Sequence, residues 1–263
     1  MIRNFVKRKV YKKKIGDFHG YSVWYVNGYW VRNNLDRDFT NFGGNRLFAF
    51  IPKDEFWIDY ENGDIKEAKY FFDSFLTIEK GIESGKTHEE SVKIADRHEK
   101  MERHKAKFLK VIKKIKVKEK VLKRVHKKFI FANYTENLKI YIVRGDLVRS
   151  LFNVDFTQGG HDKVYNFIPK NEVWIDDDLY KKEMPYVLVH ELHERYLMSK
   201  GWPYDSAGGG QKVFAKKEDE RGGKSAHFAA EDLEFWCREH PKSVRKIIAR
   251  EITRNEKMIG KGK

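Results

Sequence analysis

The sequence predicts an α+β fold, in which a small antiparallel sheet with two helices occurs as a tandem duplication joined by a long basic helix. Three observations predict it: an internal repeat, strand-like runs early in each copy, and helical runs after them. The segment at residues 25–59 recurs at 142–176 with an offset of 117 and no gap, and both copies contain Phe-Ile-Pro-Lys and Trp-Ile-Asp. A match of this length indicates two copies of one unit.

Four segments are expected along the chain. The first, degenerate repeat unit covers residues 1–96, a basic amphipathic linker helix covers 97–130, the second repeat unit covers 131–241, and a basic C-terminal tail covers 242–263. A hydrophobic content of 40% over 263 residues is sufficient for real cores.

Runs rich in Val, Ile, Tyr and Trp predict three strands in each copy. They cover residues 21–26, 47–51 and 56–58 in the first copy and 139–143, 164–168 and 173–175 in the second. The glycine pairs Gly43-Gly44 and Gly159-Gly160 predict turns before the middle strands, and the Ile-Pro pairs end those strands.

Two helical runs follow the strands of each copy. In the second copy they cover about 182–200 and 225–239, and each ends before a proline. The first of these runs has apolar residues on nearly every side, which is typical of a buried helix. It also contains His-Glu-Leu-His-Glu at 190–194. Buried charge is costly unless it is paired or bound to a metal, so this stretch needs a partner.

The His-Glu-Leu-His-Glu stretch is a variant of the HExxH arrangement of metallohydrolases. His190 and Glu194 are separated by one helical turn and share a face, so both are expected to bind a metal ion. Glu191 is the expected general base, and His193 is an alternative ligand or a proton donor.

The second helix repeats the i, i+4 spacing with His227 and Glu231. Two facing helices that each offer His and Glu predict a mononuclear or dinuclear site for a divalent metal, zinc first and manganese or iron next. The alternative is a solvated or purely structural polar network, because the apolar face of this helix lies roughly opposite His227 and Glu231.

The two copies differ at these positions when one deletion aligns their helices. The first copy has Ser74, Phe75, Thr77, Ile78, Val92 and Asp96 at the positions of His190, Glu191, His193, Glu194, His227 and Glu231. His161 likewise stands where the first copy has Gly44. We therefore expect a working second unit beside a structural first one, with shared residues such as Trp174 holding the fold.

The run from His190 to Arg195, followed by Ala226-His227 and Ala230-Glu231, resembles a group of phage and archaeal-virus-type proteins with this helix pair. The resemblance covers most of residues 138–240 and more faintly 20–96. Its form is similar to that of zincin-like metallohydrolases, which implies a metal at His190 and Glu191 as the general base. The sequence departs from zincins in having Glu194 at the i+4 position, and in an insertion after Ala207.

That insertion, at about 208–224, is rich in glycine and charge. It is expected to be a loop, either a solvated one or a lid over the site beside His190.

The segment from residue 97 to 128 contains fifteen Lys or Arg and only three Glu, and this explains most of the net charge of +15. Met101, Phe108, Ile115 and Leu122 recur with a seven-residue period, which predicts an amphipathic helix. Three roles are open: a solvated interdomain helix, a phosphate-binding surface, or a surface for anionic membranes. The candidate nucleic-acid-binding residues are Lys110, Lys113, Lys114, Lys116, Lys118, Lys120, Lys123 and Arg124.

Composition also excludes some classes of protein. The lone Cys237 excludes an internal disulfide and a cysteine-rich zinc site. No apolar run predicts a transmembrane segment, and the N-terminus lacks the core of a signal peptide, so a cytoplasmic protein is expected, in the host cytosol if it is viral. Two functions follow: a metal-dependent hydrolase that acts on or near nucleic acid, or a non-catalytic nucleic-acid-binding or virion protein.

Overall fold

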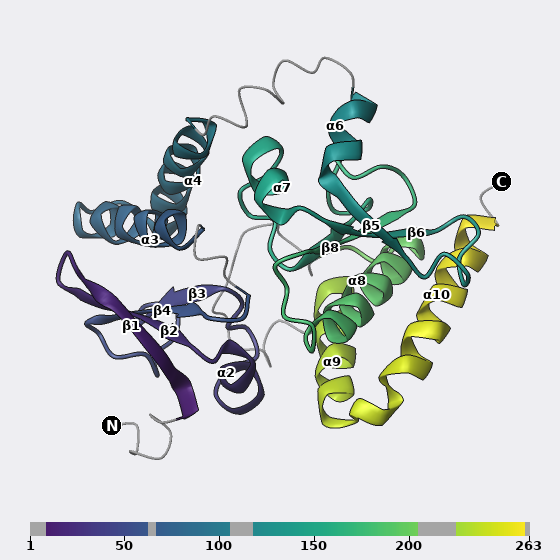
Figure 1. Ribbon diagram of the computed structural model, residues 1–263, viewed down its shortest axis with the longest axis horizontal. Coiled ribbons are helices and arrows are strands. Elements are labelled where there is room, and N and C mark those ends of the chain that lie inside the picture. The colour runs from purple at the N-terminus through teal and green to yellow at the C-terminus, as the bar shows by residue number, and fades with distance from the viewer. Residues whose placement is uncertain (1–8, 63–66, 106–117, 205–224, 261–263) are drawn as a thin grey trace. The chain divides into compact units, whose positions relative to one another are not determined.

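The computed structural model describes residues 9–62, 67–105, 118–204 and 225–260, and the chain divides into two compact units (Figure 1). Unit 1 consists of residues 1–122, 145–157 and 178–180, and unit 2 consists of residues 123–144, 158–177 and 181–263. Residues 145–157, which follow the first strands of the second copy, thus belong to unit 1.

Each unit contains one four-stranded sheet, and the two sheets have the same strand order. In unit 1 the order is β1-β2-β4-β3, with β1 at Tyr11–Phe18, β2 at Tyr21–Val26, β3 at Phe42–Gly44 and β4 at Glu55–Asp59. In unit 2 it is β5-β6-β8-β7, with β5 at His126–Ile130, β6 at Lys139–Val143, β7 at Gly159–His161 and β8 at Glu172–Asp176. Trp24 pairs with Trp57 and Tyr141 with Trp174, so the register also agrees at an offset of 117.

The fold is mixed α and β as expected, but the prediction that each sheet is antiparallel is wrong. β2 and β4 are parallel, as are β6 and β8. The connection between the two strands of each pair contains a short helix and an edge strand. This connection is long enough for the second strand to run in the same direction as the first. These short helices, α2 (Gly28–Asn34) and α7 (Gly145–Leu151), were not expected from the sequence.

The middle strand of each copy was also wrongly placed. The glycine pairs form the edge strands β3 and β7, whereas residues 47–51 and 164–168 form turns. In unit 1 the turn begins where the amides of Leu47 and Phe48 donate to the carbonyl of Gly44. A Cβ on Gly43 or Gly44 would come within 2.7 Å of an aromatic side chain, so glycine is needed in β3 for close packing.

The strands β1 and β5 were not expected because their sequences are rich in lysine. Both lie at the edge of their sheet, where charged side chains discourage pairing with other chains.

The predicted helix pairs are confirmed. They are α3 (Ala68–Glu83) with α4 (His88–His104) in unit 1, and α8 (Met184–Ser199) with α9 (Ala226–Glu239) in unit 2. The expected basic tail is instead a short 3₁₀ turn (Pro241–Ser243) and helix α10 (Val244–Gly260), which packs against α8.

The prediction of a single basic helix over 97–130 is wrong at both ends. Residues 97–104 belong to α4, α6 covers Lys118–Val125, and residues 126–130 form β5 because they pair with β6. Residues 106–117, which include Lys110, Lys113, Lys114 and Lys116, lie outside the described residues, as does the 208–224 insertion.

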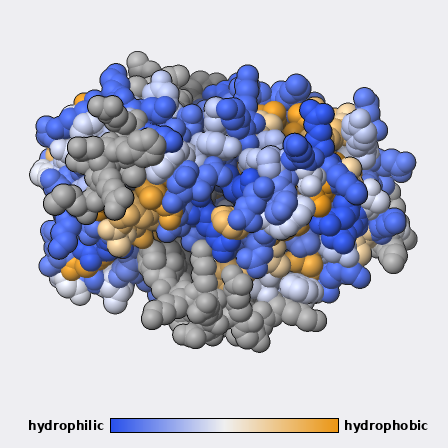
Figure 2. Space-filling model, turned by 90° about the horizontal axis from the view of Figure 1, so that it is seen from below, coloured by the Kyte–Doolittle hydropathy of each residue, from blue (hydrophilic) through white to orange (hydrophobic). Residues whose placement is uncertain are grey.

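Apolar residues cover both faces of the unit 1 sheet. Val23, Phe56 and Phe75 form one cluster with α3, and Val31 and Trp57 belong to a second cluster on the opposite face. The described residues on the face shown in Figure 2 are mostly hydrophilic, with small apolar patches among them. Within the described ranges, no helix has the length and apolar character required to cross a bilayer.

Candidate metal centre

Helix α8 lies in the interior of unit 2 because it packs against β7, β8, α9 and α10. It begins with Pro185 in its first turn and ends before Gly201, whose φ of +85° suits a residue without a side chain. The buried aliphatic residues of α8 fix its rotation, and this rotation directs His190, Glu191 and Glu194 into the protein interior.

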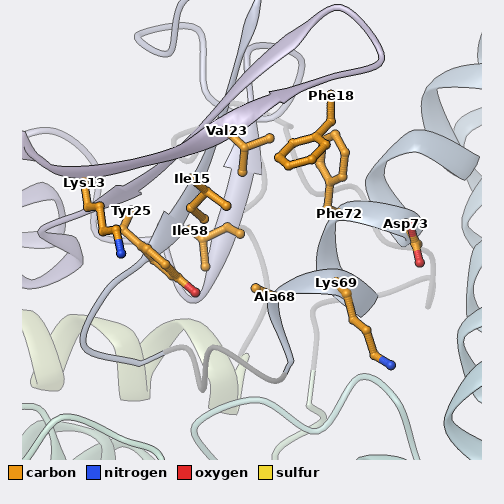
Figure 3. Close-up of a pocket in the computed structure, with 10 residues that line it drawn as sticks. All are labelled: Lys13, Ile15, Phe18, Val23, Tyr25, Ile58, Ala68, Lys69, Phe72 and Asp73. Atoms are coloured by element: carbon orange, nitrogen blue, oxygen red, sulfur yellow. The ribbon is translucent and has the colours of Figure 1, made fainter.

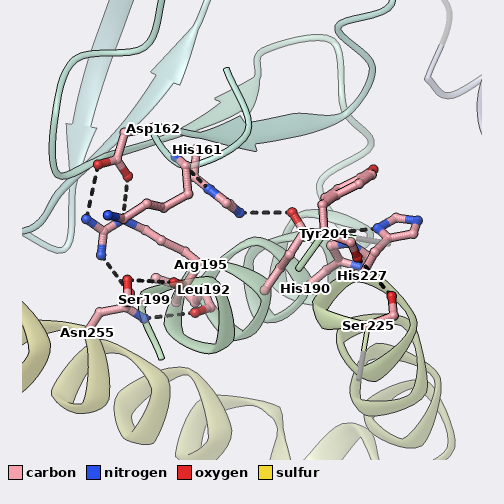
Figure 4. A network of polar contacts seen from close by, with 12 residues as sticks. His161, Asp162, His190, Leu192, Arg195, Ser199, Tyr204, Ser225, His227 and Asn255 are labelled. Carbon is pink, nitrogen blue, oxygen red and sulfur yellow. Dashed lines mark hydrogen bonds and ion pairs between the residues drawn. The ribbon is translucent and has the colours of Figure 1, made fainter. Parts of the chain in front are cut away.

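Glu194 is the centre of a cluster of imidazoles and is 3% exposed. Its Oε1 accepts a hydrogen bond of 2.9 Å from Nε2 of His161, and its Oε2 lies 2.8 Å from Nδ1 of His227 and 3.4 Å from Nε2 of His190 (Figure 4). Burial by itself would raise the pKa of Glu194, but the contacts with these three imidazoles hold it well below its usual range.

His161 has a defined tautomer. Its Nδ1 accepts a hydrogen bond from the backbone N–H of Lys163 at 3.1 Å, so the proton is on Nε2 and is donated to Glu194. Burial lowers the pKa of His161, which keeps the ring neutral. Because both ring nitrogens are engaged, His161 orients Glu194 and is poorly placed to bind a metal.

His190 lies between two carboxylates. Its Nε2 faces Glu194, and its Nδ1 lies 3.1 Å from Oε2 of Glu234 on α9. Burial opposes the charged imidazole, yet the two carboxylates raise the pKa of His190 well above its usual value. The pKa of Glu234 falls to about 2, since its contacts with His190 and Arg238 outweigh the opposing effect of burial.

Glu234 also belongs to a network that both units contain. In unit 2, Arg238 bonds to Glu183 at 2.5 Å and to Glu234 at 2.6 Å. In unit 1, Arg103 bonds to Glu67 and to Glu99 at the corresponding positions, each at 2.8 Å. The shared Glu-Arg-Glu network therefore holds the helix pair together, and His190 is an addition to it that unit 1 lacks.

His227 lies on the first turn of α9, which Ser225 caps by accepting the N–H of Phe228. Its ring centre is 5.0 Å from that of His190, and the ring of Tyr204 stacks on it with the ring centres 4.9 Å apart. Glu231 lies 3.5 Å from Nε2 of His227, the nitrogen opposite to the one that faces Glu194. The geometry thus separates Glu231 from the group formed by His190, Glu194 and His227.

Glu191 lies beside this group, and one of its oxygens is within 4.8 Å of Glu194 and His161. Burial, together with the nearby charge of Glu194, raises the pKa of Glu191 to about 8. The backbone of Gly159 makes room for this side chain, because a Cβ there would be 3.1 Å from Glu191 Cγ. A buried carboxyl with this pKa is able to take up and release a proton near neutral pH.

His193, expected to work with these residues, points elsewhere. Its Nδ1 lies 3.0 Å from Oε2 of Glu251 on α10, so it connects two helices outside the cluster.

Unit 1 has a hydrocarbon interface where unit 2 has the cluster. Phe42 stacks on Phe71 with ring centres 4.7 Å apart, and the ring of Phe75 lies over Gly44. Phe42 and Phe75 stand at the positions of Gly159 and Glu191. The same scaffold is therefore packed with aromatic rings in one unit and with titratable groups in the other.

Three ligand atoms lie close to the spacing of a metal site. In a tetrahedral zinc site with bonds of about 2.0–2.1 Å, neighbouring ligand atoms are about 3.3–3.4 Å apart. The distances from Glu194 Oε2 to His190 Nε2 and His227 Nδ1 are 3.4 and 2.8 Å. One ligand atom from each of the three residues lies within 4.8 Å of the other two. These three residues are a donor set that could hold a divalent cation after small side-chain movements.

The structure also brings residues to the site that were not predicted to take part. His161 could have been found, because it replaces Gly44 of the first copy. Glu234 also had a signal, since it follows His227 by seven residues and so shares its helix face. Tyr204 had no such signal in the sequence. Comparison of the chain with protein-family models, curated proteins and solved structures gives no match.

Proposed function

We propose that unit 2 is a metal-dependent hydrolase whose metal ligands are His190, Glu194 and His227. The observation that carries this proposal is the convergence of three ligand atoms on one point inside a unit whose counterpart is filled with phenylalanine. A divalent cation there, zinc first and manganese or iron next, would supply Lewis-acid activation of the bond to be cleaved.

The other residues of the site have separate roles. Glu191 takes up and returns the proton during hydrolysis, since its carboxyl is buried and its pKa is about 8. His161 holds Glu194 from Oε1 and leaves Oε2 for the cation, while Glu234 holds the ring of His190 through Nδ1. This assignment uses the zincin-like resemblance of His190 and Glu191. Of the two ligands expected on the second helix, it keeps His227 and leaves out Glu231.

Metal analysis tests the proposal most directly. Protein incubated with zinc and then dialysed is expected to retain a single ion per chain, and His190→Ala and Glu194→Ala are expected to lose it. His193→Ala is the matched control, because it removes an imidazole from the same helix outside the cluster. Equal, substoichiometric zinc in all four proteins would refute the metal site.

Activity is tested separately with Glu191→Gln. This variant is expected to keep its metal and lose hydrolysis of a simple phosphodiester or peptide substrate. Metal retained together with unchanged hydrolysis would remove Glu191 from the mechanism.

Nucleic-acid binding is the second candidate function, either as the setting of the hydrolase or in a non-catalytic virion protein. It is supported by the net charge of +15 and by the exposed Lys120, Lys123 and Arg124 of α6. In gel shifts, nucleic-acid binding is expected to weaken as the salt concentration rises. This salt dependence is expected to be smaller after Lys120, Lys123 and Arg124 are changed to Gln. Binding unaffected by these changes would argue against α6.

We also infer that the chain arose by tandem duplication of a unit like that of the phage and archaeal-virus-type proteins that it resembles. The equal strand order, the equal register and the paired Glu-Arg-Glu networks support this. A cytoplasmic location is part of the same proposal, since Cys237 is the single cysteine of the chain.

A further inference from the structure

Unit 1 contains a cavity of about 370 Å³ between its sheet and α3 (Figure 3). This volume lies toward the lower end of the range of about 300–1,000 Å³ that small-molecule sites span. It is separate from the metal centre, which belongs to unit 2, so ligand binding in this cavity does not depend on the proposed hydrolase.

The cavity is open because, among the described residues, α3 is covered by fewer elements than its counterpart α8. α8 is packed by both α9 and α10, and Val189 on α8 is 0% exposed. Asp73 stands at the position of Val189 and is exposed. Three residues after Val189 on α8, the carbonyl of Leu192 accepts a hydrogen bond from Asn255 of α10. The side of α3 that lines the cavity thus corresponds to the side of α8 that α10 covers.

The interior of the cavity is apolar. Val23 and Ile58 form the floor from the sheet, and Phe72 lines the α3 side. Ile15 and Phe18 of the edge strand β1 remain 36% and 45% exposed. An apolar ligand would remove these side chains from water, and this provides the favourable free energy of binding.

The rim of the cavity is cationic. Lys13 and Lys69 lie on opposite sides of it (Figure 3), against Asp73, the single acid among the lining residues. The ammonium group of Lys13 and the hydroxyl of Tyr25 end on the same side of the cavity (Figure 3). Both groups are donors suited to a carboxylate oxygen.

We propose that this cavity binds an amphipathic organic anion, namely a free carboxylate with an aliphatic chain. The chain lies on Val23, Ile58 and Phe72, and the carboxylate lies beside Lys13. A neutral or cationic amphiphile would gain the same apolar contacts without the favourable charge.

Calorimetry with dodecanoate, below the concentration at which it aggregates, tests this. Wild-type protein is expected to bind it at a single site, and dodecyltrimethylammonium more than tenfold more weakly. Lys13→Glu is expected to weaken dodecanoate binding about five- to tenfold. Ala68→Trp, which fills the cavity from the first residue of α3, is expected to abolish it. The matched control is Lys53→Glu, which reverses an exposed charge away from the cavity.

Three results would overturn the proposal: no binding of dodecanoate, equal binding by wild type and Lys13→Glu, or equal affinity for the cationic amphiphile. If thermal unfolding shows that Ala68→Trp is not folded, Lys13→Glu and the ligand comparison decide alone. Sedimentation with phosphatidylglycerol vesicles separates a lipid surface from a free ligand. Vesicle binding that dodecanoate does not compete with would assign the anion site to a membrane surface and reject the cavity.

Discussion

His161 donates a hydrogen bond of 2.9 Å to Glu194, across the interface between an edge strand and a buried helix. Unit 1 has Gly44 and Ile78 at these two positions, and its interface is filled by the ring of Phe75. The titratable groups of unit 2 are therefore not required by the scaffold, since unit 1 builds the same sheet and helix pair without them.

Removing the donor to Glu194 is expected to weaken metal binding. In His161→Ala, Oε1 of Glu194 loses its partner, and zinc affinity is expected to fall about 10- to 100-fold. A competition titration with a chelating dye measures this. His193→Ala should leave the affinity unchanged, and an equal loss in both variants would contradict the role of His161.

Gly159→Ala is expected to disturb Glu191 while leaving the three ligand residues in place. The new Cβ would lie 3.1 Å from Glu191 Oε1 and from the carbonyl oxygen of Trp174. We expect a loss of stability of about 1–3 kcal/mol and reduced hydrolysis with normal zinc content. Gly260→Ala, whose Cβ would meet no atom within 4 Å, is the control. Unchanged activity in Gly159→Ala would show that Glu191 has room to move.

The shared networks predict similar losses of stability in the two units. Arg103→Ala removes a cation from the buried Glu67 and Glu99, of which Glu67 keeps Arg149. Arg238→Ala removes one from Glu183 and Glu234, of which Glu234 keeps His190. Each change is expected to cost about 3–5 kcal/mol. Calorimetric unfolding with limited proteolysis reports which unit is affected. Only Arg238→Ala is expected to lower zinc affinity as well, because Glu234 contacts His190.

Glu256 on α10 makes the stability of the folded protein depend on pH, independently of the metal centre. Its carboxylate accepts the N–H groups of Glu136, Asn137 and Leu138, and despite partial burial these bonds lower the pKa of Glu256. The resulting stabilisation is present above the unfolded pKa of about 4.5 and is lost as pH falls through the lower folded value.

Glu256→Gln should therefore be less stable than wild type at pH 7, by about 1 kcal/mol after solvent screening. The difference in melting temperature should shrink as the pH falls below 4.5. Glu239→Gln, at an exposed position, is the control. A difference between Glu256→Gln and wild type that does not change with pH would contradict this account.

The strand-like runs and helical periodicity of the sequence predicted β2, β4, β6, β8 and the two helix pairs, because these elements bury regular apolar faces. The periodicity could not predict β3 and β7, since Gly43-Gly44 and Gly159-Gly160 are typical of turns and become strands only where a neighbouring strand and helix need close approach. Lysine-rich β1 and β5 were missed for a similar reason, because their pairing partners are distant in the sequence.

The sequence by itself determined which copy carries the titratable residues, since a comparison of two copies requires only an alignment. The tertiary structure decided which of them meet. It brought His190, Glu194 and His227 together, added His161 and Glu234, and directed His193 to Glu251. The physical reason is that a helix spacing fixes only which residues share a face, whereas the packing of α8 against β7, α9 and α10 decides what each face meets.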